Sequence, residues 1–403
     1  MSPWRMLILL AIAELAAMSL WFGASAVVAA MADEYGVGEA GQAWLTMSVQ
    51  LGFVAGALLS AVFNIADRIR GPVLFAATAL LGAAANAAIA LRPPYEAVLV
   101  LRFGTGALLA GVYPTGMKIM ASWFRRHRGL GIGTLVGALT VGSALPHLLH
   151  AVPLFGGEPG LPPWRDVVLA VSALAAGGGL LAGLFVREGP ELLRPARFAW
   201  QHAACVVTDP PVRLANLGYL GHMWELYAMW TWAPLLLLES HRAAGLGEVR
   251  GRLAAFATIA AGGVGSVLAG RLADRFGRTV VAGTSLAVSG SCCLAAGWLL
   301  PCPGWLTFVC VLWGFAVVAD SAQFSAAISE LCDRAHVGTA LTMQTCLGFL
   351  LTLVTIRGLP LAREAFGPGP AFAALAIGPV FGLWAMLRLR RSPAAARMAS
   401  GRR

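Results

Sequence analysis

Charged residues are scarce in this chain. Of its 403 residues, only 12% are Asp, Glu, Lys or Arg, and 58% are hydrophobic. Soluble domains carry about 25% charged residues, so this composition excludes an ordinary soluble fold. The apolar runs are roughly twenty residues long, as transmembrane helices require. Strands of a membrane β-barrel are alternating segments of about ten residues. The sequence therefore predicts an all-α integral membrane protein.

Motifs for catalysis and cofactor binding are also missing. The seven cysteines show no metal-ligand spacing, and those inside apolar runs are typical of small buried residues. No stretch matches the glycine-rich phosphate loop that ends in Lys-Ser/Thr. We therefore expect no enzyme activity, no metal and no other cofactor, and no direct drive by ATP. The net charge of +10 is no argument for a nucleic-acid partner, because its distribution is explained by membrane topology.

Twelve apolar runs divide the chain into two sets of six. The predicted spans are 6–31, 41–63, 73–91, 96–121, 129–151, 167–186, 213–238, 251–269, 280–300, 304–329, 336–359 and 368–388. The longest polar connection lies between the sixth and seventh spans. We predict an N-terminal half (1–186), a linker (187–212), a C-terminal half (213–388) and a basic tail (389–403).

The positive residues predict the orientation of the chain. Arg5, the connections after even-numbered spans and the tail hold most of the arginines. Lys and Arg gather on the cytoplasmic side of membrane proteins. We therefore expect both termini in the cytoplasm, where the tail contacts the anionic inner leaflet.

The two halves repeat a short pattern. "ELAAMSLW" begins at Glu14 in the first span, and "ELYAMWTW" begins at Glu225 in the seventh. The loop after the second span reads "FNIADRIRGP", and the loop after the eighth reads "GRLADRFGRT". Similar residues at equivalent places indicate parallel repeats, an arrangement known in transporters.

These loops resemble the cytoplasmic signature of the major facilitator superfamily. The fit is close for Gly270, Asp274, Arg275, Gly277 and Arg278, and the first loop keeps Asp67 and Arg68 but has Phe63 and Arg70 in the glycine places. "RFGTG", with Arg102, resembles the superfamily's motif in the fourth span. Other stretches are similar to a bacterial branch with some likeness to nitrate and cyanate permeases, which implies a protein of the bacterial inner membrane. The resemblance implies twelve helices in two pseudo-symmetric halves, with Asp67 and Asp274 in a conformational latch rather than simple loop anchors.

The resemblance also implies that spans one, four, seven and ten line a central cavity. These spans contain buried ionisable residues on faces with small or aromatic neighbours, which suits a water-filled path. The candidate proton-coupling and substrate-cavity residues are Glu14, Trp21, Arg102, Tyr113, His222, Glu225, Tyr227, Trp232, Asp320 and Gln323. We expect Glu225, with His222 one turn away, to carry a proton or to balance substrate charge; a structural hydrogen bond is the alternative. For His147, a cavity position and a satisfied polar contact are both open.

These features predict a secondary active transporter that works as a monomer. It would move a small organic solute with a planar or charged part, coupled to protons, with import slightly favoured over export. A proton-driven multidrug or metabolite exporter is one alternative. A membrane sensor or scaffold that no longer transports is another.

Overall fold

The computed structural model describes residues 2–124, 128–152, 162–190, 198–333 and 336–402, and these are almost entirely helical. Within these described ranges, ten helices or runs of consecutive helices are long and apolar enough to cross a membrane. In the N-terminal half they are α3 (Glu39–Val62), α5 with η2 (Gly71–Ala88, Ile89–Leu91), α6 with α7 (Tyr95–Leu109, Tyr113–Trp123), α8 (Arg128–Ala151) and α9 (Trp164–Phe185). In the C-terminal half they are α12 (Glu248–Phe276), α13 with η4 (Arg278–Ala296, Gly297–Leu299), α14 with α15 (Pro303–Ala319, Ser321–Leu331), α16 (Val337–Phe366) and α17, η5 and α18 (Pro368–Ala373, Ala374–Ala376, Ile377–Arg390).

Two further segments complete the twelve predicted crossings. The first runs through α1 (Pro3–Met18), a turn, η1 (Ser25–Val27) and α2 (Val28–Tyr35), so no single helix in it is long enough. The seventh is α11 (Pro210–Ala243), a helix of 34 residues that is rich in polar and aromatic side chains. Short helices α4 (Ile65–Arg68) and α10 (Cys205–Thr208) lie in connections, with η3 (Trp200–His202) in the linker and η6 and η7 (Pro393–Arg397, Ala399–Gly401) in the tail.

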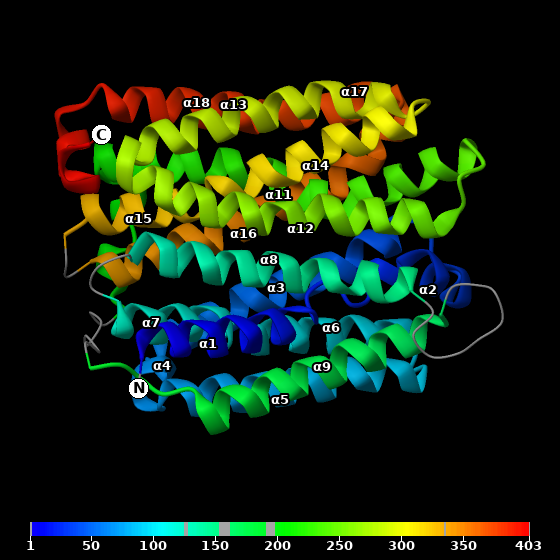
Figure 1. Ribbon diagram of the computed structural model, residues 1–403, viewed down its shortest axis with the longest axis horizontal. Coiled ribbons are helices and arrows are strands. Elements are labelled where there is room, and N and C mark those ends of the chain that lie inside the picture. The colour runs from blue at the N-terminus through cyan, green and yellow to red at the C-terminus, as the bar shows by residue number, and fades with distance from the viewer. Residues whose placement is uncertain (1, 125–127, 153–161, 191–197, 334–335, 403) are drawn as a thin grey trace.

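The two sets of six helices form two bodies that lie side by side. Figure 1 shows the early helices in one body and the late helices in the other, with α8 and α12 adjacent where they meet. A second contact between the bodies joins α3 and α16. Both chain ends lie at the same end of the molecule (Figure 1).

Small residues allow the close approach of α8 and α12. A Cβ added at Gly133 would lie 2.8 Å from the Ser266 carbonyl oxygen, and one at Gly137 would lie 2.9 Å from that of Gly263. The Ser266 hydroxyl donates a hydrogen bond of 3.0 Å to the Gly133 carbonyl. Backbones packed this tightly leave a smooth interface that suits sliding of one half against the other.

Three of the four spans expected to line the cavity are interrupted. The first breaks after Met18, the fourth between Leu109 and Tyr113, and the tenth at Asp320. In the fourth span, Pro114 stands in the first turn of the new helix, where a residue without an N–H is tolerated. Interrupted helices leave backbone carbonyls without helical partners inside the molecule, and those groups need other donors.

Candidate functional site

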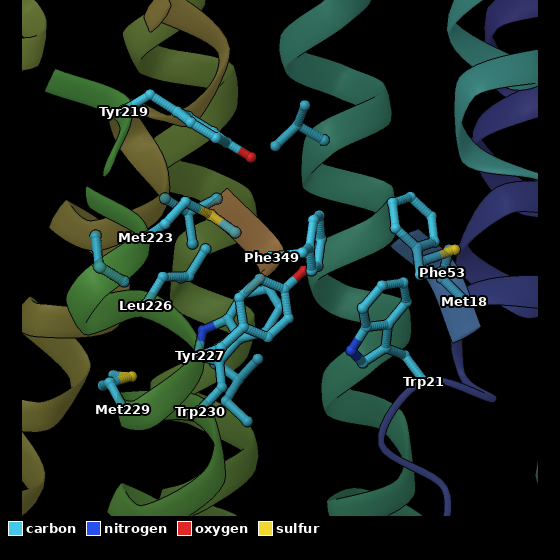
Figure 2. Close-up of a cluster of buried hydrophobic side chains, with 14 of the residues drawn as sticks. Met18, Trp21, Phe53, Tyr219, Met223, Leu226, Tyr227, Met229, Trp230 and Phe349 are labelled. Atoms are coloured by element: carbon cyan, nitrogen blue, oxygen red, sulfur yellow. The ribbon is translucent and has the colours of Figure 1, made fainter. Parts of the chain in front are cut away.

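An aromatic cluster joins the two halves where the first span breaks. Figure 2 shows Trp21 and Phe53 of the N-terminal half facing Tyr227 and Phe349 of the C-terminal half. The Trp21 ring centroid lies 5.0 Å from that of Phe53, 5.7 Å from that of Tyr227 and 5.5 Å from that of Phe349. These distances are typical of favourable aromatic pairs. These four rings, which we call the central aromatic cluster, are therefore a contact shared by both halves, with an apolar surface suited to a planar ligand.

Several buried hydrogen-bond donors in and around this cluster have no acceptor. The indole nitrogens of Trp21 and Trp230 and the amide nitrogen of Gln50 are buried and have no hydrogen-bond partner among the described residues. The Gln50 oxygen accepts a hydrogen bond from Thr352, which links α3 to α16 across the halves. Buried polar groups are nearly always paired in folded proteins. Three unpaired donors beside aromatic rings therefore suit a ligand that carries acceptor atoms.

Arg102 holds the break in the first span. Its guanidinium donates to the carbonyl oxygens of Leu20 (2.9 Å), Trp21 (2.5 Å) and Leu45 (3.3 Å). A fourth contact of 3.3 Å goes to the side-chain oxygen of Asn86. The side chain is fully buried. Arg102 thus supplies the donors that the interrupted helix lacks and fixes the backbone that carries Trp21.

Glu14 points into the interior of its own half. The side chain is fully buried, and its oxygens lack a hydrogen-bond partner among the described residues. A Cβ added at Gly116 would lie 2.6 Å from the Glu14 Oε2 atom. Tyr113 is the first residue of α7, three residues before Gly116. The carboxyl group therefore lies beside the fourth span and not in the central aromatic cluster.

Glu225 also points into its own half. Its oxygens accept hydrogen bonds from the Ser289 hydroxyl (2.6 Å), the Cys293 thiol (3.1 Å) and the Trp313 indole (3.0 Å). These donors belong to the ninth span and to the first helix of the tenth, whereas Glu14 lies beside Gly116 in the second helix of the fourth span. The two glutamates of the repeat lie inside separate halves. This placement differs from the expectation that both carboxyl groups face one shared cavity.

His222 and Asp320 form another buried site with an acidic residue, also in the C-terminal half. The His222 Nδ1 atom lies 2.9 Å from an Asp320 carboxylate oxygen, and both side chains are fully buried. Asp320 occupies the break between α14 and α15, so the contact ties α11 to an interrupted helix. Asp320 makes no well-aligned side-chain hydrogen bond to any described residue. This carboxyl group is therefore held mainly by the imidazole.

The remaining cavity candidates have separate places. The Trp232 indole donates 3.0 Å to the Ile356 carbonyl of α16, within the same half. Gln323 accepts a hydrogen bond of 3.2 Å from Arg278. Of the ten candidates, Trp21 and Tyr227 meet in the central aromatic cluster, and His222 meets Asp320. The sequence reasoning missed Phe53 and Phe349, for which no polar residue or repeat gave a signal.

The two Asp-Arg loops make different contacts. Asp67 forms an ion pair of 2.6 Å with Lys118 in its own half, and Arg68 is exposed. Asp274 lies 3.3 Å from Arg278, which also reaches Glu330 at 3.1 Å. These contacts tie the eighth, ninth and tenth spans together at one end.

Asp274 also reaches the opposite half. A Cβ added at Gly129 would lie 2.7 Å from its carboxylate, so the acid lies at the beginning of α8. Negative charge is favourable there because helix N–H groups are unpaired. Gly270 packs against Gly129, and Gly277 has φ +97°, which an L side chain rarely adopts. Arg275 lies over the Phe276 ring at 5.2 Å. The latch role of this loop stays a prediction.

No cluster of three or more His, Cys, Asp or Glu side chains in the described ranges is arranged to hold a metal ion. The site is thus built from aromatic rings, unpaired donors and buried carboxyl groups that lie around interrupted helices. In a membrane protein with two six-helix halves, these features are typical of secondary transporters.

Comparison with known proteins identifies the family. Residues 10–356 match the sequence model of the Major Facilitator Superfamily, and the chain belongs to that superfamily. It is a multi-pass membrane protein of twelve helices in two halves. A solved structure of the proton:xylose symporter XylE, bound to 6-bromo-6-deoxy-D-glucose, shares this fold with a TM-score of 0.72. That match covers 96% of this chain and 95% of XylE at 14% sequence identity.

A curated relative gives a more distant indication of function. The chain is 26% identical over 310 residues to the niacin transporter NiaP of Acinetobacter baylyi. The matched region is 67% of this chain and 66% of the relative, just under two thirds of the relative's length.

Proposed function

We propose that this protein is a proton-coupled secondary transporter that imports a small planar organic solute across the inner membrane. The central aromatic cluster carries the proposal, because both halves contribute to it and it contains unpaired buried donors. A flat ring can stack on these side chains while its acceptor atoms meet the donors. The niacin transported by the relative NiaP is a solute of this kind, so niacin is our first candidate substrate.

Two halves that part alternately at either end would expose the cluster to one side at a time. The small-residue contact between α8 and α12 supports such rocking, since close backbones offer few side chains that interlock. We place both termini in the cytoplasm, as the arginine distribution indicates. The structure describes one chain that contains both halves, and we propose that it works as a monomer.

Buried carboxyl groups are the candidates for proton coupling. Three donors satisfy Glu225 within one half, so its environment does not depend on the contact between halves. Asp320 depends on His222 and lies at a helix break, where movement of the tenth span would change its surroundings. Both groups can exchange a proton, and Asp320 with His222 is better placed to do so in step with a conformational change.

Uptake of radiolabelled niacin by proteoliposomes under an imposed pH gradient tests this function. We expect wild-type protein to accumulate niacin when the outside is acidic and to lose that accumulation when a protonophore is added. Asp320→Asn should still exchange niacin for niacin without accumulating it, because binding remains but coupling is lost.

Glu225→Gln is the matched comparison, since it removes the other buried acid of the same half. If Glu225→Gln loses niacin accumulation and Asp320→Asn keeps it, Glu225 and not Asp320 is the proton-coupling residue. Niacin movement that ignores the pH gradient in wild type would refute proton coupling. Absence of transport for niacin and for other planar acids, amides and amines would refute the function.

A further inference from the structure

A backbone carbonyl near the end of the first span is held by both halves. The Ala26 oxygen lies 3.2 Å from the Arg252 Nη1 atom, which comes from α12 in the C-terminal half. The same oxygen lies 3.2 Å from the His150 Nδ1 atom of α8, which donates when its proton is on Nδ1. Two donors from facing helices therefore converge on one acceptor at the end of the molecule that we place toward the periplasm.

Donor capacity at this point exceeds what the protein uses. Arg252 and His147 are 8% and 4% exposed, and the Arg252 Nε and His147 Nε2 atoms have no partner among the described residues. Ser25, Ala26, His147 and Arg252 line a cavity between the halves. Its volume of about 20 Å³ fits a single water molecule. Apolar residues, among them Pro234, Leu235, Leu238 and Ala255, complete the lining. A buried N–H without an acceptor is costly, so an acceptor that reached the Arg252 Nε atom would be stabilising.

The local charge is also positive. Among the described residues, Glu248 is the acid that pairs with these arginines, and it is shared between Arg252 at 3.3 Å and the more exposed Arg242. Two guanidinium groups thus face one carboxylate. The second positive charge is available to an anion, and Arg252 is the buried one of the two arginines.

We propose that Arg252, His147 and His150 form a carboxylate-binding subsite at the periplasmic entrance, which the Ala26 carbonyl occupies while the halves are closed there. When the halves part, the Ala26 oxygen leaves Arg252 and a carboxylate of the incoming solute takes its place. A carboxylate accepts stronger hydrogen bonds from a guanidinium than a neutral carbonyl does. The exchange therefore favours opening in the presence of an acid and selects acids over their neutral amides.

This subsite deepens the proposed function, on which it rests for the direction of entry. It lies along the first span from the central aromatic cluster, since Ala26 is five residues beyond Trp21. An aromatic acid would meet the basic groups first and the aromatic rings next. The solute class that fits both parts is a small planar monocarboxylate.

Equilibrium binding to the purified full-length protein tests the subsite without requiring transport. The probes are two acid and amide pairs of equal shape: nicotinate with nicotinamide, and benzoate with benzamide. We expect wild-type protein to bind at least one acid about ten-fold more tightly than its amide. Arg252→Gln should remove this preference while leaving amide binding within about two-fold, and His147→Gln should reduce the preference in part.

Arg242→Gln is the matched control, because it removes the other arginine that pairs with Glu248 but lies outside the cavity. It should lower the acid preference less than Arg252→Gln does, because Glu248 then pairs with Arg252 alone while the Arg252 side chain stays in the cavity. Arg252→Lys, which keeps the charge, should retain part of it and shows whether loss in Arg252→Gln reflects misfolding.

Three results would overturn the subsite. The first is that the wild type binds acids no more tightly than amides. The second is that Arg252→Gln keeps the acid preference. The third is that Arg242→Gln loses as much of the acid preference as Arg252→Gln does. The outcome is separable from that of the proposed function. Selective binding without coupled uptake would leave the subsite standing and refute the transport proposal. Proton-coupled uptake by the wild type, together with an unchanged acid preference in Arg252→Gln, would refute the subsite and leave the transport proposal standing.

Discussion

Arg102→Gln should destabilise the protein strongly, because the guanidinium holds several buried acceptors of the protein. The guanidinium donates to the carbonyls of Leu20, Trp21 and Leu45 and to the Asn86 side chain. Gln offers one NH₂ group on a shorter side chain and cannot reach all four acceptors. The substitution therefore removes the buried guanidinium donor of the Trp21 carbonyl and weakens the support of the Leu20 carbonyl, which also accepts from the Gly23 N–H.

The cost follows from these contacts. A hydrogen bond to a charged group stabilises a fold by about 1.5–3 kcal/mol net. The contacts of 2.5 Å and 2.9 Å to Trp21 and Leu20 are the strongest of the four. Counting these two alone, and noting that Gln recovers part of one, we expect a loss of about 3–5 kcal/mol in unfolding free energy.

The assay is reversible unfolding in mixed detergent micelles, followed by circular dichroism. Arg388→Gln is the control, because Arg388 is an exposed arginine near the end of α18. It should lower the unfolding free energy by about 0.5 kcal/mol or less. If Arg102→Gln were no more destabilising than Arg388→Gln, the assignment of Arg102 as the support of the helix break would be wrong.

Three more outcomes follow from single contacts. Gly133→Leu should abolish niacin uptake by proteoliposomes while the protein still assembles in the membrane, because a side chain there meets the Ser266 backbone at the α8–α12 contact. Normal uptake would refute the close-packing argument. Glu225→Gln should lower the unfolding free energy by about 1–2 kcal/mol, measured as for Arg102, since an amide cannot accept from three donors as a carboxylate does; unchanged stability would count against that network. Burial, followed by electrostatic repulsion from the nearby Cys205 sulfur, raises the pKa of the Cys332 thiol to about 11. Alkylation needs the thiolate, so Cys332 should react far more slowly than the exposed Cys302 at pH 7 and accelerate about ten-fold per pH unit up to pH 10; a rate independent of pH would contradict this.

The sequence predicted the span pattern because each apolar run must be long enough to cross a bilayer. It also predicted that Glu14 and Glu225 occupy equivalent places in one shared cavity. The structure turns each carboxyl group into its own half, Glu14 toward Gly116 and Glu225 toward Trp313. The helix breaks were harder to foresee, because residues 19–24 are as apolar as the helices around them. The support for that break comes from Arg102, more than eighty residues away.

The direction of each buried side chain could not be predicted from periodicity. Periodicity groups Glu225 and Trp232 on one face, but it does not say which neighbour that face meets. The structure turns Glu225 toward Trp313 and brings Tyr227 to the central aromatic cluster. Phe53 and Phe349 gave no signal because an isolated Phe in an apolar run is ordinary. Their importance depends on the contact between halves, which no local pattern contains.

Rocking of the two halves is the central claim, and paired distance measurements test it most directly. One pair of spin labels would replace Glu39 and Phe366, at the ends of α3 and α16 that we place toward the periplasm. The other pair would replace Phe63 and Asp333, at the opposite end. On addition of niacin in an acidic buffer, we predict that one distance lengthens while the other shortens. If both distances stay fixed, or both change in the same direction, the two halves do not alternate and the account is wrong.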